Sequence, residues 1–340
     1  MLDQELLDAN ELISQDRPED VRRILMECGQ IDHDEKIVSV GMAGDGNMNC
    51  TLRVVTDRRQ FIVKQSRPWV EKYPSIPAPM NRALYEIQFY ETVAGTGDVA
   101  GRMPKLLGVD RSRHLLVLED LGEGKDGTFL YNEYDESQVA KQIPGLAQWL
   151  ASLHGQTRDR LGAVDFSNRE LRQLNHAYIF EIPFQYPPAI VLDSITPGLD
   201  EIAREFSEHS ELVQRAAELG ELYLSDGDTL LHGDFFPGSW LFTSREVFVI
   251  DPEFCYAGRP EFDLAVCVAH LRMMGAAQEQ ADKLLQTYES LASPVDRQLV
   301  NAWAGIEIIR RLLGVAQLPL TRTLEQKREL LTTAKGLVLA

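Results

Sequence analysis

Residues 230–254 read LLHGDFFPGSWLFTSREVFVIDPEF, and this stretch decides the fold. An apolar run ends at His-Gly-Asp (232–234), a Pro-Gly turn follows, and a second apolar run, Val247–Ile250, ends at Asp-Pro-Glu (251–253). Strands hold the side chains at their ends with little freedom, so three carboxylates are predicted to converge on one small volume. Such a cluster repels itself unless a cation neutralises it, and carboxylate oxygens are ligands that suit Mg²⁺.

The chemistry that follows from this cluster is phosphoryl transfer. One acid that stays off the metal can accept a proton from a substrate hydroxyl, which is the arrangement that phosphoryl transfer needs. The alternative is two ordinary strands ending in solvated acids, and either half of the pattern alone would favour it. Both halves together, in this order, favour the phosphoryl-transfer site.

The composition fits a protein of two ordinary domains. The chain has 340 residues, 44% of them hydrophobic, and a formal net charge of −18, which argues against nucleic-acid and anionic-membrane partners. No run approaches the roughly 18 apolar residues of a membrane span, and the acidic N-terminus lacks a signal-peptide core. The four cysteines form no C-x-x-C pair, so we expect reduced thiols and a cytoplasmic location. The oligomeric state is left open, a homodimer included.

The order of predicted elements indicates an α+β protein of two lobes. Strands at 37–40, 50–55 and 61–65 form a meander with a glycine loop between the first two, and a helix at 81–93 and strands at 105–109 and 114–119 complete an N-terminal lobe, 1–120. A hinge is predicted at 121–124. The C-terminal lobe, 121–340, is larger and mostly helical, with helices at 137–155, 199–219, 277–292 and 296–316 around the strands of 222–256. Residues 1–30 read as two short helices that break near 17–18.

A glycine-rich loop at 41–49 (GMAGDGNMN) is a candidate phosphate site. Glycines there let backbone N–H groups approach phosphate oxygens, whereas the alternative is a plain hairpin turn. The loop lacks the Gly-Lys-Ser/Thr ending of a P-loop. The candidate nucleotide-binding residues in it are Gly44, Asp45, Gly46, Asn47 and Asn49.

Lys64, near the end of the third strand, is the second nucleotide-binding candidate. A lone strand lysine usually extends outward into solvent. Glu86 in the following helix changes that interpretation, because kinases pair such a lysine with a helix glutamate to hold it against the nucleotide. Glu91, more than one turn further on, is the weaker partner.

Several blocks of sequence carry a resemblance to a known family. They are 44–49, 62–70, 82–86, 232–239, 251–254, 258–263 and 309–316. In combination they resemble the methylthioribose kinases, which belong with the aminoglycoside and choline kinases to the protein-kinase-like small-molecule kinases. Most relatives place Asn at the position of Ser239.

The resemblance implies a protein-kinase-like bilobal fold and ATP-dependent phosphorylation of a small-molecule hydroxyl, most closely on a methylthioribose-like sugar. It implies that Asp234 orients and deprotonates this hydroxyl, so that Asp234 is both catalytic and substrate-binding. Asp251 and Glu253 would hold Mg²⁺, with Ser239 as a weak ligand at most. Asp263 would brace the loop at 232–234 from behind.

The same resemblance assigns roles at the hinge and in the last long helix predicted. The backbone groups of Glu119 and Leu121 are the expected adenine partners, because a strand edge offers a C=O and an N–H two residues apart. Arg310 and Arg311 would hold the sugar or transition-state charge. The alternative is that one arginine binds Glu307 or another acid and the other is solvated, since adjacent helical residues diverge by about 100°.

Two rival functions remain at this point. One is a kinase for an amino alcohol or aminoglycoside, which an acidic acceptor pocket would favour and the two arginines oppose. The other is a nucleotide-binding protein without activity. A degraded kinase usually loses at least one of its working residues, and this chain keeps all five candidates: Lys64, Glu86, Asp234, Asp251 and Glu253.

Overall fold

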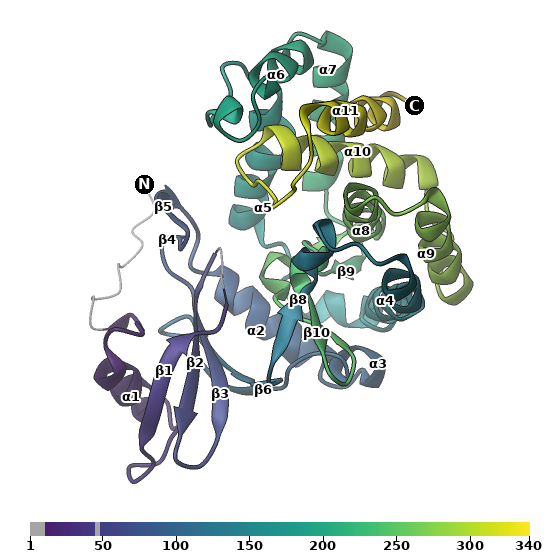
Figure 1. Ribbon diagram of the computed structural model, residues 1–340. Helices are drawn as coiled ribbons and strands as arrows, with labels where there is room; N and C mark the ends of the chain where they lie inside the picture. The colour runs from purple at the N-terminus through teal and green to yellow at the C-terminus, as the bar shows by residue number, and fades with distance from the viewer. Residues whose placement is uncertain (1–10, 45–47) are drawn as a thin grey trace. The chain divides into compact units, whose positions relative to one another are not determined.

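The computed structural model describes residues 11–44 and 48–340, which form two compact units (Figure 1). Unit 1 contains the described residues up to Gly124 together with Asp251–Phe254, and unit 2 contains Lys125–Ile250 and Cys255–Ala340. The sequence placed a single boundary at 120/121. The structure differs because the acidic segment, Asp251–Phe254, packs against the helix of unit 1 although its flanking residues belong to unit 2.

Unit 1 is built on a five-stranded antiparallel sheet in the order β1-β2-β3-β7-β6. Its strands are β1 (Ile37–Met42), β2 (Cys50–Thr56), β3 (Gln60–Gln65), β6 (Leu106–Asp110) and β7 (Leu115–Glu119). The predicted meander is confirmed, with β1 paired to β2 and β2 to β3. Alternate residues of β2 are buried, and helix α1 (Pro18–Glu27), drawn beside these strands in Figure 1, adds its apolar face to the same core.

One main helix, α2 (Arg82–Val93), completes unit 1 as predicted, with the single turn α3 (Gly97–Ala100) after it. The proline-rich segment before α2 forms a hairpin, β4 (Trp69–Val70) and β5 (Tyr73–Pro77), where no strand was predicted. Helix α2 buries two charged residues, Arg82 and Glu86, among its apolar ones. Charged side chains are seldom fully buried unless paired, so this face of α2 points to an internal ionic contact.

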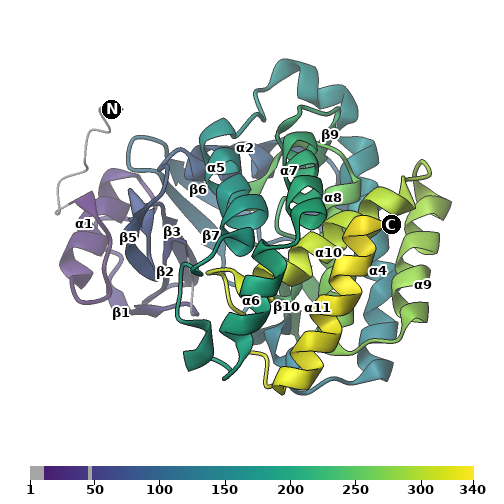
Figure 2. The ribbon, with the colours of Figure 1, turned by 90° about the horizontal axis from the view of Figure 1, so that it is seen from above.

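Unit 2 is mostly helical, as predicted. Its helices are α4 (Glu136–Gln156), α5 (Arg169–His176), α6 (Leu199–Ser207), α7 (Ser210–Leu224), α8 (Glu261–Met274), α9 (Gln278–Leu291), α10 (Arg297–Leu313) and α11 (Leu324–Leu339). Helix α10 packs against both α8 and α11, and Figure 2 shows α10 and α11 side by side. None of the helices in residues 11–44 and 48–340 is long and apolar enough to cross a bilayer.

Two details of unit 2 differ from the sequence prediction. The single helix expected at 199–219 is wrong, because the chain breaks at 208–209 and the His209 ring caps α7 by accepting a hydrogen bond from the Leu212 N–H (3.2 Å). Helix α11 was not predicted. Its Thr323 and Gln326 form a capping box, a start signal that the sequence contained.

Short strands flank both acidic motifs. They are β8 (Gly124–Asp126), β9 (Thr229–Leu231), β10 (Trp240–Thr243), β11 (Val247–Val249) and β12 (Tyr256–Gly258). β9 pairs with β12 and leads into the His-Gly-Asp loop, residues 232–234, while β11 pairs with β10 and leads toward Asp251. Both lead strands are completely buried, and the Phe235 ring stacks on Trp149 of α4 at 5.4 Å. The strand ends are therefore held firmly, as the sequence predicted.

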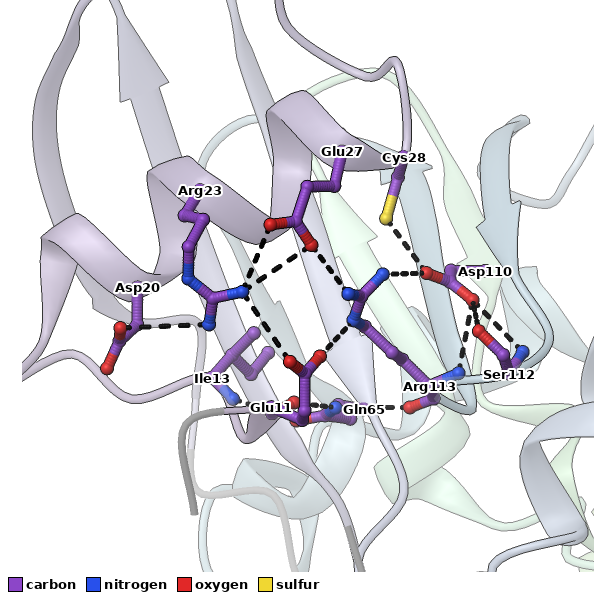
Figure 3. A network of polar contacts seen from close by, with 10 residues as sticks. All are labelled: Glu11, Ile13, Asp20, Arg23, Glu27, Cys28, Gln65, Asp110, Ser112 and Arg113. Atoms are coloured by element: carbon purple, nitrogen blue, oxygen red, sulfur yellow. Dashed lines mark hydrogen bonds and ion pairs between the residues drawn. The ribbon is translucent and has the colours of Figure 1, made fainter. Parts of the chain in front are cut away.

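A polar network ties the start of the described chain to the sheet of unit 1 (Figure 3). Arg113 contacts Glu11, and it lies 2.5 Å from Glu27 and 2.8 Å from Asp110. Gln65, at the end of β3, has no exposed surface. Its amide accepts from the Ile13 N–H (2.8 Å) and donates to the carbonyl oxygens of Glu11 (2.9 Å) and Arg113 (3.1 Å).

We expect Gln65→Ala to destabilise unit 1 strongly. The change leaves three backbone groups without their partner, which we estimate to lower the free energy of unfolding by about 2 to 4 kcal/mol. Gln60→Ala, on the exposed start of the same strand, is the matched control and should stay within about 0.5 kcal/mol of wild type. Urea unfolding measures both. Equal stabilities of the two variants would show that Gln65 does not anchor the N-terminal residues.

Candidate active site

The acidic segment carries one exposed and one buried carboxylate. Asp251 adopts φ 68°, a left-handed conformation that is uncommon for a residue other than glycine and is often found at functional sites. Its side chain is 48% exposed, whereas the side chain of Glu253 is 2% exposed. Of the pair, Asp251 is therefore the acid that solvent and ligands can reach.

Lys64 connects Asp251 to helix α2. The Lys64 ammonium lies 2.6 Å from Glu86 and also contacts Asp251. The predicted pairing of Lys64 with Glu86 is confirmed, and Glu91 instead binds Arg111 at the surface. Burial alone would lower the pKa of Lys64, but the carboxylates of Asp251 and Glu86 outweigh it and raise this pKa, so the lysine stays charged.

Glu253 is held from within unit 1. The Asn49 amide donates to Glu253 Oε2 (2.8 Å), and Arg82 Nε lies 3.2 Å from the same oxygen. Burial raises the pKa of Glu253, with the charge of Asp251 adding to the rise and the cations Lys64 and Arg82 opposing it. Burial likewise raises the pKa of Glu86.

The acids of unit 1 fit a divalent cation. Three carboxyl groups, those of Glu86, Asp251 and Glu253, lie with only two cations, Lys64 and Arg82, and the raised pKa values of Glu86 and Glu253 indicate that a further cation would stabilise their ionised forms. Among the residues that the structure describes, no three His, Cys, Asp or Glu form a metal cluster of their own. Mg²⁺ is usually held by one or two carboxylates, with substrate phosphates and waters as its other ligands, and Asp251 with Glu253 provides two carboxylates on one segment.

The predicted nucleotide-binding residues are only partly described. Asp45, Gly46 and Asn47 lie outside the described residues, and Gly44 before them has φ 133°. The Asn49 side chain is buried and bonded to Glu253 and Ser66 inside unit 1, and its contact with a nucleotide stays a prediction.

Strand β7 ends at Glu119, two residues before the predicted hinge at 121–124. The Glu119 N–H donates to the Lys105 carbonyl (2.9 Å), and Arg53 binds the next residue, Asp120 (2.7 Å). Leu121 follows directly, ahead of Gly122 with its φ of 85°. The backbone around Leu121 is therefore fixed on both sides, although the adenine contact itself stays a prediction.

In unit 2, Asp263 holds the His-Gly-Asp loop. Its carboxylate accepts from the backbone N–H of His232 (2.8 Å) and of Gly233 (2.9 Å), and from the His154 ring (3.2 Å). This is the bracing contact that the sequence predicted. The His232 ring donates from Nε2 to the Ile250 carbonyl oxygen (3.0 Å), so this side chain also holds the loop in place.

The twin arginines, Arg310 and Arg311, both reach Asp234. Their Nη2 atoms lie 3.4 and 3.2 Å from Asp234 Oδ1. Both guanidinium groups are buried, so the alternative that one of them is solvated is wrong. Long flexible side chains let two adjacent helical residues converge on one acid. Burial raises the pKa of Asp234, and the two arginines oppose that rise.

A buried polar chain lies behind the twin arginines, and the sequence analysis named only its Glu307, as a partner of one arginine; the contacts of His270 and Tyr131 were not predicted. Glu307, one turn earlier on α10, accepts from Arg311 Nε (2.8 Å), Arg310 Nη2 (3.0 Å) and the His270 ring (2.9 Å). Burial lowers the pKa of His270 to about 4, so the ring is neutral at pH 7, donates to Glu307 and accepts from the Tyr131 hydroxyl. The spacing of Glu307 from both arginines could have indicated this clamp.

Ser239, proposed as a weak metal ligand, is buried in unit 2. Its hydroxyl donates to the Asp234 carbonyl oxygen (2.9 Å), which supports the backbone of the loop. Nearby, the Phe236 ring lies 4.7 Å from the Arg311 guanidinium. The ring thus makes a cation–π contact with one of the two arginines that bind Asp234.

Comparison with known proteins agrees with this geometry. Residues 43–303 match the model of the phosphotransferase enzyme family. The chain is 27% identical to the methylthioribose kinase of Geobacillus kaustophilus, over 86% of this chain and 83% of that protein. It is 24% identical to methylthioribose kinase 1 of Oryza sativa subsp. japonica, over 78% and 66% of the two chains.

Solved structures share the fold at low sequence identity. Choline kinase LicA from Streptococcus pneumoniae is 15% identical, with a TM-score of 0.54 over 96% of this chain and 99% of that chain. A GDP complex of aminoglycoside 2'-phosphotransferase-IIIa is 16% identical, with a TM-score of 0.56 over 95% and 99% of the two chains. The fold is thus the protein-kinase-like α+β fold that the sequence predicted.

The family match covers well over half of the chain and includes Lys64, Glu86, Asp234 and the acidic segment. The chain therefore belongs to the phosphotransferase enzyme family, and it is a small-molecule kinase that transfers phosphate to a hydroxyl group.

Proposed function

We propose that this protein transfers the γ-phosphate of ATP to a hydroxyl of a small sugar, most closely 5-methylthioribose. The observation that carries the proposal is the clamp of both twin arginines on one oxygen of Asp234. The relatives named methylthioribose kinase in bacteria and in rice support the choice of sugar.

Unit 1 would bind the nucleotide. Lys64, fixed by Glu86, would contact the phosphates, and the loop that begins at Gly41 would cover them. Asp251 with Glu253 would hold Mg²⁺, which when bound neutralises phosphate charge and orients the transferred group. The contact of Lys64 with Asp251 keeps both groups in place before the substrates arrive.

Asp234 would act as the base. Its Oδ1 atom is held by both arginines, whereas no hydrogen bond within the described residues goes to Oδ2. Oδ2 would accept the hydroxyl proton as the acceptor oxygen bonds to the γ-phosphorus and ADP leaves with the electrons of the broken P–O bond. The two contacts on Oδ1 restrict rotation of the carboxylate, so that Oδ2 keeps a preferred direction.

The charge around Asp234 favours a neutral acceptor. Two carboxylates, Asp234 and Glu307, are balanced by the twin arginines, so the buried cluster carries no net charge. A cationic amino alcohol or aminoglycoside would meet two guanidinium groups here. A sugar hydroxyl can instead accept hydrogen bonds from them.

The direct test is ADP release with a panel of acceptors, measured with Mg²⁺ and with EDTA. We expect turnover with 5-methylthioribose, none with EDTA, and little with choline or kanamycin. Preference for choline or kanamycin would overturn the sugar assignment. ADP release with none of these acceptors would contradict the whole proposal.

We expect Asp234→Asn to lower kcat by about 10³-fold, because a positioned base contributes on the order of 10² to 10⁴ to the rate. The affinity for MgATP, measured by calorimetry, should stay unchanged, since Asp234 belongs to unit 2 and the nucleotide is proposed to bind to unit 1. In the wild type the pKa of Asp234 is raised, so this base becomes protonated at a higher pH than an ordinary aspartate does. As the pH is lowered, kcat should therefore begin to fall while the pH is still above the usual titration range of aspartate. Near-normal turnover of the variant would remove Asp234 from its role.

We expect Arg311→Lys and Arg310→Lys to raise the KM for the sugar and lower kcat, with the ATP KM unchanged. Lysine keeps the charge but loses the planar fork that binds Glu307 and Asp234 at once. Arg322→Lys is the matched control, because Arg322 bonds only backbone carbonyl oxygens in unit 2. Steady-state kinetics with both substrates measures these changes. If both variants keep the wild-type kcat and the wild-type KM for the sugar, the arginines do not belong to the acceptor site.

A further inference from the structure

A buried guanidinium lies at the centre of unit 1. Arg82, the first residue of α2, has no exposed surface, yet all of its N–H groups have acceptors. Nε donates to Asn49 Oδ1 (2.9 Å), and Nη1 donates to the carbonyl oxygens of Arg67 (2.9 Å) and Pro79 (2.8 Å). Nη2 donates to the carbonyl oxygens of Met48 (2.8 Å) and Trp69 (3.4 Å).

These acceptors come from four separate segments. They are the end of the glycine-rich loop, the chain after β3, the turn before α2 and, through the ion pair with Glu253, the acidic segment. Only arginine supplies five donors in one plane, and a lysine would leave at least two of the acceptors without a partner. The side chain is thus matched to its environment.

Arg82 contacts the two parts of unit 1 that are proposed to bind MgATP, the glycine-rich loop and the acidic segment. Met48 and Asn49 directly follow the loop proposed to cover the phosphates, and Glu253 belongs to the segment proposed to hold the metal. Asn49 adds a direct link, because its amide donates to Glu253 while its oxygen accepts from Arg82. A displacement of either part therefore strains the other.

Helix α2 carries both halves of this arrangement. Arg82 and Glu86 are one turn apart on the same buried face. Glu86 holds Lys64 and, through it, Asp251, while Arg82 holds Glu253. The two acids of the acidic segment are thus positioned by one rigid helix.

From this geometry we infer that Arg82 is a positioning residue, which couples the end of the glycine-rich loop, at Met48 and Asn49, to the acidic segment. The inference rests on the proposed function and deepens it. Arg82 is fully buried and bonded to protein atoms, so its assigned role is to hold other residues in place rather than to bind substrate or metal. Its effect is that cation binding at Asp251 and Glu253 steadies the loop, and phosphate binding by the loop steadies the two acids.

The coupling can be measured without turnover. Calorimetry gives the dissociation constant of ADP without and with Mg²⁺, and the ratio of the two reports how strongly metal and nucleotide support each other. We expect Arg82→Lys to lower this ratio by about fivefold or more, in the range of typical coupling effects. The affinity for ADP without Mg²⁺ should change much less.

Arg172→Lys is the matched control for a purely structural role. Arg172 is also buried and donates to backbone carbonyl oxygens, those of Tyr223 (2.9 Å) and Ser225 (2.9 Å), in unit 2. This variant should lose thermal stability but keep the wild-type ratio. A loss of the ratio in Arg172→Lys as large as in Arg82→Lys would overturn the inference.

Two further variants make the test decisive. Glu253→Gln combined with Arg82→Lys should lower the ratio no further than Glu253→Gln alone, because both changes break one link. If Arg82→Lys does not fold, Asn49→Ala, which keeps the four carbonyl contacts of Arg82, should still lower the ratio. A folded Arg82→Lys, or in its place Asn49→Ala, with the wild-type ratio refutes the coupling, whereas a wild type without any Mg²⁺ effect refutes the proposed function itself.

Discussion

Buried carboxylates that must find cations govern both units of this protein. Removing a carboxylate from water costs several kcal/mol unless a charge partner and hydrogen bonds compensate. In unit 1 that requirement is met by Lys64, which pairs with Glu86, and by Arg82, which pairs with Glu253; in unit 2 it is met by the twin arginines. The strands and helices that carry these partners are therefore held in place relative to the acids inside each unit, because moving them apart would leave a charge without its partner.

Much of the fold follows from local signals in the sequence. Runs of apolar and β-branched residues between turn signals predicted the strands of the meander, and the acids at strand ends indicated the two motifs. The pairing of Lys64 with Glu86 and the bracing contact of Asp263 were also predicted, and both occur. These cases share one property: each signal consists of a strand or helix end with a functional residue type placed on it.

The contacts that escaped prediction depend on residues far apart in the chain. Arg82 collects acceptors between residues 48 and 253, and the chain from Tyr131 through His270 to Glu307 spans three helical regions. No spacing in the sequence encodes such a meeting. The division of 199–219 into two helices was missed for another reason, because a histidine cap is a weak signal beside continuous apolar periodicity. The roles of the site residues themselves stay predictions.

The excursion of four residues from unit 2 into unit 1 constrains how the chain is made. During synthesis, the residues up to Gly124 are made long before Asp251–Phe254. Lys64, Asn49 and Arg82 therefore lack these acidic partners until most of the protein has been translated. Unit 1 reaches its final charge balance only after unit 2 has supplied that segment. Translation order and ionic pairing thus make the completion of the first unit depend on the second.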